Sequence, residues 1–171
     1  MTTSVEPGTW HLEPTASTVA IKHKTMWGMV TVKGAFTAVR GEGEVAQNGT
    51  AQGTVTVGAA SIDTKNTKRD THLRSADFFD VEKHPDITLA IRDVKLDSDD
   101  TAKVSGQLTV RGISRPLALT ARVVPAGRDT VTLTTEFTVD RDQFGMSWNQ
   151  MGMIRGLAIV TASLRFTRTG S

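Results

Sequence analysis

Apolar and polar residues alternate with a period of two along most of this 171-residue chain. Ile87, Leu89 and Ile91 share one face of an extended segment, and Thr88 and Arg92 belong to the other face. This is the period of a β-strand with one buried face. The same alternation recurs at residues 19–24, 30–37, 55–57, 104–110, 117–123 and 131–139. The pattern predicts a β-rich domain built from many short strands.

The final apolar run, residues 157–166, is apolar on both faces for much of its length. Such a strand is either central in its sheet or covered by a neighbouring subunit. Turn residues separate the runs: Asn48-Gly49 predicts a type I′ hairpin, and Gly112 together with Arg115-Pro116 predicts a corner. Strands joined by tight turns at short spacing are typical of an antiparallel meander, which closes into a barrel to remove its edges.

One segment breaks the period of two and predicts a short helix. Asn66 is a suitable N-cap for a helix that continues to Ser75. Asp70 and Arg74 lie four residues apart, in the order that favours a side-chain pair on a helix. No internal repeat, linker or low-complexity tract interrupts the pattern, so residues 1–171 are expected to form a single domain.

Composition and charge exclude several classes of protein. The chain has no cysteine, which excludes disulfides and thiolate metal sites. Its 20 Lys and Arg and 18 Asp and Glu residues are interspersed, which disfavours a nucleic-acid surface. No apolar run is long enough to span a membrane as a helix, and the start of the chain does not resemble a signal peptide. We therefore expect no integral membrane segment and a cytoplasmic location; a periplasmic or secreted location would require a leader that had been removed.

The sequence carries no recognisable catalytic or metal-binding motif. His11, His23, His72 and His84 do not pair at metal-ligand spacing, and no H-E-x-x-H motif is present. The aspartates are scattered and lie mostly at predicted turns. We therefore predict no metal site, no catalytic residue and no enzymatic cofactor, and expect a protein that is not an enzyme.

The inner face of the predicted barrel consists mainly of small and aliphatic residues. A barrel of eight strands is either filled by its own side chains or holds one small ligand. Gly34, Ala59, Gly106 and Ala121 leave room unless the opposite walls compensate. The methionine-rich stretch 146–153 suits an adaptable apolar surface, although methionine is also an ordinary packing residue. Composition alone leaves both a cavity and a solid core open.

Four segments, in this order and spacing, carry a family resemblance. They are GTWHLEPTASTVAIKHKTMWGMVTVKGAF, SIDTKNTKRDTHLRSADFFDVEKHPDITL, VSGQLTVRGISRPLAL and VDRDQFGM. The second segment is the most distinctive, with its Arg69-Asp70, Phe78-Phe79 and Pro85. Together these segments resemble the YceI-like family, the lipocalin-like polyisoprenoid-binding proteins, nearly from end to end.

The resemblance implies an all-β fold: an extended antiparallel, lipocalin-like β-barrel of about eight strands, with a short helix capping one end. It also implies an apolar tunnel that binds a long-chain amphiphile, such as a polyisoprenoid, an isoprenoid quinone or a fatty amide, for storage or transport. Such a lipid or quinone would be the partner of the protein, and a homodimer is a further expectation because dimers are common in the family.

Alternation of faces, combined with the resemblance, gives a hypothetical binding site. The residues expected to line the tunnel are Ile21, Phe36, Val57, Phe78, Phe79, Leu89, Ile91, Leu108, Phe137 and Phe144. The residues expected near its mouth are Arg69, His72, Arg74 and Met146. The two arginines have an alternative structural role, as partners of aspartates that hold the helix on the barrel rim.

Two other functions remain open at the level of sequence. The protein could be an enzyme, or an accessory to one, that acts on such a lipid with His72 as the general base. It could also be an interaction module with a solid core, whose final strand pairs with another subunit. The lipid extracted from the purified protein would distinguish these functions.

Overall fold

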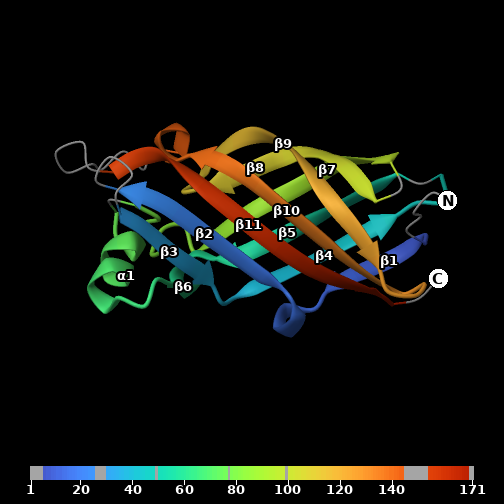
Figure 1. Cartoon of the computed structure of the whole chain (residues 1–171), viewed down its shortest axis with the longest axis horizontal. Helices are drawn as coiled ribbons and strands as arrows, with labels where there is room; N and C mark the ends of the chain where they lie inside the picture. Colours follow the sequence, from blue (N-terminus) through green and yellow to red (C-terminus); the bar gives the residue numbers. More distant parts are fainter. Residues whose placement is uncertain are drawn as a thin grey trace.

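The computed structural model describes residues 6–25, 30–48, 50–76, 78–98, 100–144 and 154–169 (Figure 1). Eight antiparallel strands form a closed barrel, because β11 at one end of the strand order also pairs with β1 at the other. In order around the wall they are β1 (Gly8–Leu12), β4 (Val39–Val45), β5 (Ala51–Gly58), β7 (Asp86–Ser98), β8 (Thr101–Val110), β9 (Ile113–Pro125), β10 (Thr130–Asp140) and β11 (Ile154–Arg168). The prediction of a closed antiparallel barrel is confirmed.

Three further strands extend the wall beside β11. They are β2 (Thr18–Thr25), β3 (Val30–Phe36) and the two-residue β6 (Ile62–Asp63). Strand β11 therefore has β10 on one side and β1 and β2 in succession on the other. A central position in the sheet is one of the two alternatives that its sequence predicts.

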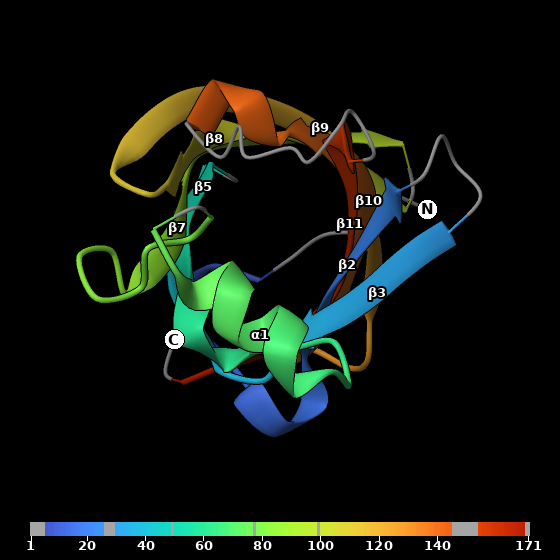
Figure 2. The same ribbon diagram turned by 90° about the vertical axis from the view of Figure 1, so that its left-hand side faces the viewer.

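The helix α1 (Thr67–Arg74) begins where the sequence predicts it. The Asn66 side chain accepts a hydrogen bond from the Arg69 N–H at 3.0 Å and so caps the helix, and Ser75 ends it. Figure 2 shows α1 lying across one end of the barrel, and Figure 1 places β1 and the end of β11 towards the other. The described residues also include the short 3-10 turns η1 (Pro14–Ala16), η3 (Ala59–Ser61) and η4 (Arg141–Phe144).

The predicted corner at Arg115-Pro116 is wrong. The turn between β8 and β9 consists of Arg111 and Gly112, with φ angles of 56° and 74°, and Val110 pairs directly with Ile113. Positive φ at both central residues is the signature of a type I′ turn, and glycine adopts it without strain. Pro116 lies inside β9, where it pairs with Gln107.

Strands β4 and β5 form the predicted hairpin, and Val45↔Ala51 is its last ladder pair. Gly49 lies outside the described residues, so the type I′ geometry predicted at Asn48-Gly49 stays a prediction.

The interior side chains are packed most tightly near the two ends of the barrel. Near the chain ends the buried residues are Trp10, Leu12, Ala102, Val123, Val131 and Phe166, and below α1 they are Phe36, Ile62, Phe78 and Phe79. The degree of burial differs among the inward-facing residues of β9 and β10. Val123 and Val131 are buried, whereas Leu117, Leu133 and Val139 are only partly buried. Some inward-facing side chains of β9 and β10 are therefore less completely buried than their neighbours on the same strand.

Candidate ligand-binding site

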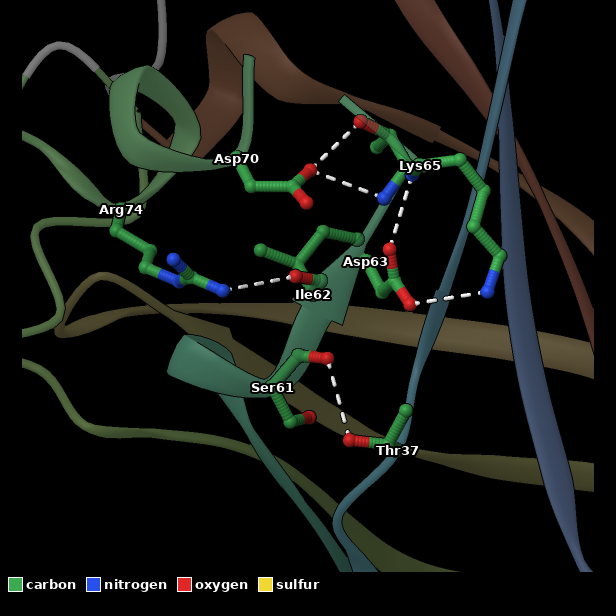
Figure 3. A network of polar contacts seen from close by, with 8 residues as sticks. Thr37, Ser61, Ile62, Asp63, Lys65, Asp70 and Arg74 are labelled. Atoms are coloured by element: carbon green, nitrogen blue, oxygen red, sulfur yellow. Dashed lines mark hydrogen bonds and ion pairs between the residues drawn. The ribbon is translucent and has the colours of Figure 1, made fainter. Parts of the chain in front are cut away.

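Two polar contacts hold α1 on the end of the barrel (Figure 3). The carboxylate of Asp70, which is 7% exposed, accepts hydrogen bonds from the Thr64 N–H at 2.9 Å and the Thr64 hydroxyl at 2.6 Å. From the last turn of the helix, Arg74 donates to the carbonyls of Ala60 at 2.9 Å and Ile62 at 3.2 Å. The helix is thus fastened from its middle and from its last turn to residues 60–64.

A second small network stabilises the turn before the helix. The Asp63 carboxylate accepts from the Lys65 N–H at 2.9 Å and pairs with the Lys65 ammonium at 3.2 Å. The first of these hydrogen bonds, and then the second, holds the pKa of Asp63 below its ordinary value. The contacts also support Lys65 in a left-handed conformation, with φ of 64°.

The Phe78-Phe79 pair follows directly from the end of α1. The chain turns back on itself, because the Phe78 N–H donates to the Ser75 carbonyl and the Phe79 N–H donates to the Leu73 carbonyl, both at 3.0 Å. Both phenyl rings are buried at 7% exposure. The Phe79 ring meets Phe36 edge to face at 5.8 Å between centroids, in a geometry that favours aromatic pairs.

The structure places the predicted tunnel residues on the inner side of the wall. Six belong to the buried core: Phe36, Val57, Phe78, Phe79, Leu108 and Phe144. Ile21, Leu89 and Ile91 are partly buried and pack against it. Phe137 is partly exposed and shares a face of β10 with Val131 and Val139. Contact between these side chains and a ligand stays a prediction.

The predicted mouth residues have different environments. Arg74 holds the helix on the rim as its alternative role required, but its partners are backbone carbonyls rather than an aspartate. Asp70, its expected helix partner, bonds to Thr64 instead. The His72 ring packs edge to face on Phe78 with 5.1 Å between centroids, and Arg69 is partly buried. Met146 lies outside the described residues.

Sequence reasoning missed the contact between Asp70 and Thr64. Both residues are buried and polar, which is uncommon unless each has a partner. The sequence gives only a weak signal for the Asp70–Thr64 contact, because an aspartate in the first turns of a helix usually interacts with the helix itself rather than with another segment.

A surface pocket of about 340 Å³ lies at the end of the barrel opposite α1. Its lining is mainly polar, from Pro7, Gly8, Thr9, Glu44, Val45, Ala46, Gln47, Thr50 and Gln52. Within the part of the chain that the structure describes, no group of three or more His, Cys, Asp or Glu side chains could hold a metal ion. The described helix is too short and polar to cross a membrane.

Solved structures with the same architecture cover almost the whole chain. BcnA of Burkholderia cenocepacia superposes with a TM-score of 0.82 over 90% of this chain and 98% of its own, at 18% sequence identity. A protein from Saccharophagus degradans, described as a polyisoprenoid binding domain, gives 0.78 over 96% and 100%, at 14% identity. The YceI protein of Campylobacter jejuni gives 0.72 over 83% and 88%, at 22% identity. At these identities the similarity shows the fold.

Curated relatives match a shorter stretch at higher identity. The UPF0312 protein ECA1782 of Pectobacterium atrosepticum is 43% identical over 75 residues, which are 44% of this chain and 38% of the relative. Protein YceI of Escherichia coli O6:H1 is 41% identical over 75 residues, 44% of this chain and 39% of the relative. The matched stretch thus spans about two fifths of these relatives. The model of the YceI-like domain matches residues 10–166. The chain therefore belongs to the YceI-like domain family.

Proposed function

We propose that the protein binds a long-chain amphiphile inside its barrel, of the class of polyisoprenoids, isoprenoid quinones or fatty amides, and stores or transports it without altering it. One observation carries this proposal. The wall is closed, yet inward-facing apolar side chains such as Ile21, Leu89, Ile91 and Leu133 remain partly exposed. An inward side chain keeps exposed area only where space lies next to it, and apolar walls favour an apolar occupant.

On the outer surface, the residues with a described exposure form no comparable apolar site. Among the residues that the structure describes, Val124 is the one large hydrophobic side chain that is substantially exposed, at 45%. Isolated exposed residues of this kind are normal on a protein surface. Among the residues with a described exposure, the apolar area is therefore concentrated on the inner face of the wall.

Burial of an alkyl or isoprenoid chain would supply enough free energy for binding. Each buried methylene contributes about 0.8 kcal/mol. About ten such groups give nearly 8 kcal/mol, which corresponds to micromolar affinity before the chain is ordered. A polar head group would need to contribute little, which agrees with the absence of a recognisable polar motif in the sequence.

The first experiment is solvent extraction of the purified protein followed by mass spectrometry. We expect one long-chain lipid per barrel, recovered unmodified after prolonged incubation. A chemically altered lipid whose formation stops in His72→Ala would instead support an enzyme. Barrels that contain no lipid and take none up would support a domain with a solid core. The edge-to-face contact with Phe78 gives His72 a packing role, so His72→Ala is expected to retain the lipid.

A bulky side chain at Leu89 is expected to abolish lipid uptake. Leu89 faces inward on β7 between Val55 and Leu108, so Leu89→Trp would place an indole ring in the space that the lipid needs. We expect at least a tenfold loss of bound lipid, measured by mass spectrometry of extracts. The matched control is Thr54→Trp, because Thr54 is exposed on the neighbouring strand. Equal lipid content in the two folded variants would contradict the proposed site.

A further inference from the structure

The barrel wall is split between β9 and β10 in its half nearer α1. The two strands pair over five residues only, from Ala121↔Thr135 to Pro125↔Val131. Residues 113–120 of β9 pair with β8, and residues 136–140 of β10 pair with β11, but within the described chain these two stretches form no ladder with each other. At the split, each of them has a neighbouring strand in the ladder on one side only.

Pro116 lies in the part of β9 that has separated from β10. The two-residue turn makes Val110 and Ile113 a hydrogen-bonded pair, so odd-numbered residues of β9 point their N–H groups to β8. Even-numbered residues point theirs to the side of β10. Pro116 has no N–H, so it offers β10 no donor and is tolerated only at such an edge.

A side chain closes the ladder at the point where the strands part. The Thr135 hydroxyl donates to the Thr120 carbonyl at 2.8 Å, immediately beyond the last ladder pair. The backbone acceptor of Thr120 is thereby satisfied without a further strand pair. The separation of β9 from β10 therefore begins at a specific position, next to the Thr135–Thr120 hydrogen bond.

The turn η4 lies beside the split and places one ring in the interior. Phe144 is 3% exposed and belongs to the buried core. Arg115 of β9 donates from its Nε to the Gln143 carbonyl at 3.1 Å, which fastens η4 to the far side of the split. Figure 2 shows this orange turn on the opposite side of the ring of strands from α1.

We propose that the long-chain ligand enters and leaves the barrel through the split between β9 and β10, and that Phe144 blocks this passage in the closed state. The inference rests on the proposed function. Opening the split requires the Arg115–Gln143 contact to break and one ring to move, while every strand ladder stays intact.

The two barrel ends are harder to open. Trp10 and Phe166 fill the end near the chain termini, with exposures of 4% and 8%. At the other end, opening would detach α1 from the hydrogen bonds of Asp70 and Arg74. Each of these routes disrupts several contacts, and one of them involves a buried carboxylate, whose unpairing is costly.

The test measures how fast a bound probe leaves the barrel. The protein is loaded with cis-parinaric acid, a fluorescent long-chain fatty acid, and its release into excess lipid vesicles is followed by stopped-flow fluorescence. We expect release to be at least tenfold faster in Phe144→Ala and several-fold faster in Arg115→Ala, with the amount of probe bound per barrel unchanged in Arg115→Ala. Arg115 is exposed, so its variant serves if Phe144→Ala does not fold.

Two control variants separate this route from the alternatives. Arg122→Ala changes an exposed arginine of β9 where the ladder with β10 is intact, and its release rate should equal that of the parent. Arg74→Ala loosens α1 and should also leave the rate unchanged. Faster release in Arg74→Ala, with parental rates in both split variants, would overturn the proposed passage while the binding function stands. A parent protein that binds no probe would sink the binding function and the passage together.

Discussion

Replacing Gly106 with valine is expected to destabilise the barrel by at least about 3 kcal/mol, because the new side chain would overlap backbone. Gly106 lies on β8 opposite Ile91, next to the position where the register between β7 and β8 slips. A Cβ at this position would collide with the Ala90 carbonyl oxygen, and its three nearest atoms all belong to the backbone of β7. None of these atoms belongs to a flexible side chain that could move aside. The backbone of β7 would therefore have to shift, and the irregular pairing of β7 with β8 next to Ile91 would be lost.

Urea denaturation followed by circular dichroism measures this effect. A domain of this size is commonly stable by about 5–15 kcal/mol, so the denaturation midpoint should fall by a large fraction. Gly127→Asn is the matched control, because Gly127 has φ of 81° and no atom within 4 Å of an added Cβ. Asparagine tolerates that conformation, so the control should keep the parental midpoint. A Gly106→Val variant with an unchanged midpoint would contradict the described pairing of β7 and β8.

The second large effect is expected at Asp70, whose replacement by alanine should cost about 2–4 kcal/mol. The change leaves the buried Thr64 N–H and hydroxyl without their acceptor and detaches the first turns of α1 from the segment before it. We expect α1 to be released while the strands remain paired. Hydrogen exchange should therefore accelerate at residues 67–74 and stay slow in β8 and β11.

Two further variants check the origin of the Asp70 effect. Lys68→Ala removes an exposed charge from the same helix and is expected to change stability by less than about 0.5 kcal/mol. In a double-mutant cycle, Asp70→Ala and Thr64→Val should be strongly non-additive, because each removes the same contact. Additive losses would mean that Asp70 stabilises the helix in another way.

The strands and the helix could be predicted from the sequence because both depend on local patterns. Alternation placed Leu117, Ala121 and Val123 on one face of β9, and the structure has them facing inward. The Asn66 cap placed the start of α1 correctly. The strands are predictable because their apolar residues recur with a period of two. The helix start is predictable because a cap residue must accept a hydrogen bond from a free backbone N–H of the first turn.

Features that depend on contacts between distant segments were not predicted. The partners of Arg74 are two backbone carbonyls, and no sequence pattern marks a carbonyl as an acceptor for a given arginine. The sequence predicts a corner at Arg115-Pro116, because proline is a common turn residue; it also lacks a backbone donor. In the structure that missing donor faces the side of β10, so the ladder with β8 continues past it. Whether Pro116 ends the strand depends on which neighbouring strand its missing N–H would face, and the sequence alone does not give the pairing of β9 with β8 and β10.

The pairing of the first strand with the last places the two ends of the described chain side by side. Trp10 and Arg168 are direct partners, and Arg168 is also held by an ion pair of 2.7 Å with Asp129. A short linker would therefore join these ends without strain, and the exposed β8–β9 turn offers a place to open the chain elsewhere. A circular permutant that starts at Gly112 would keep every ladder while reversing the order in which its halves leave the ribosome.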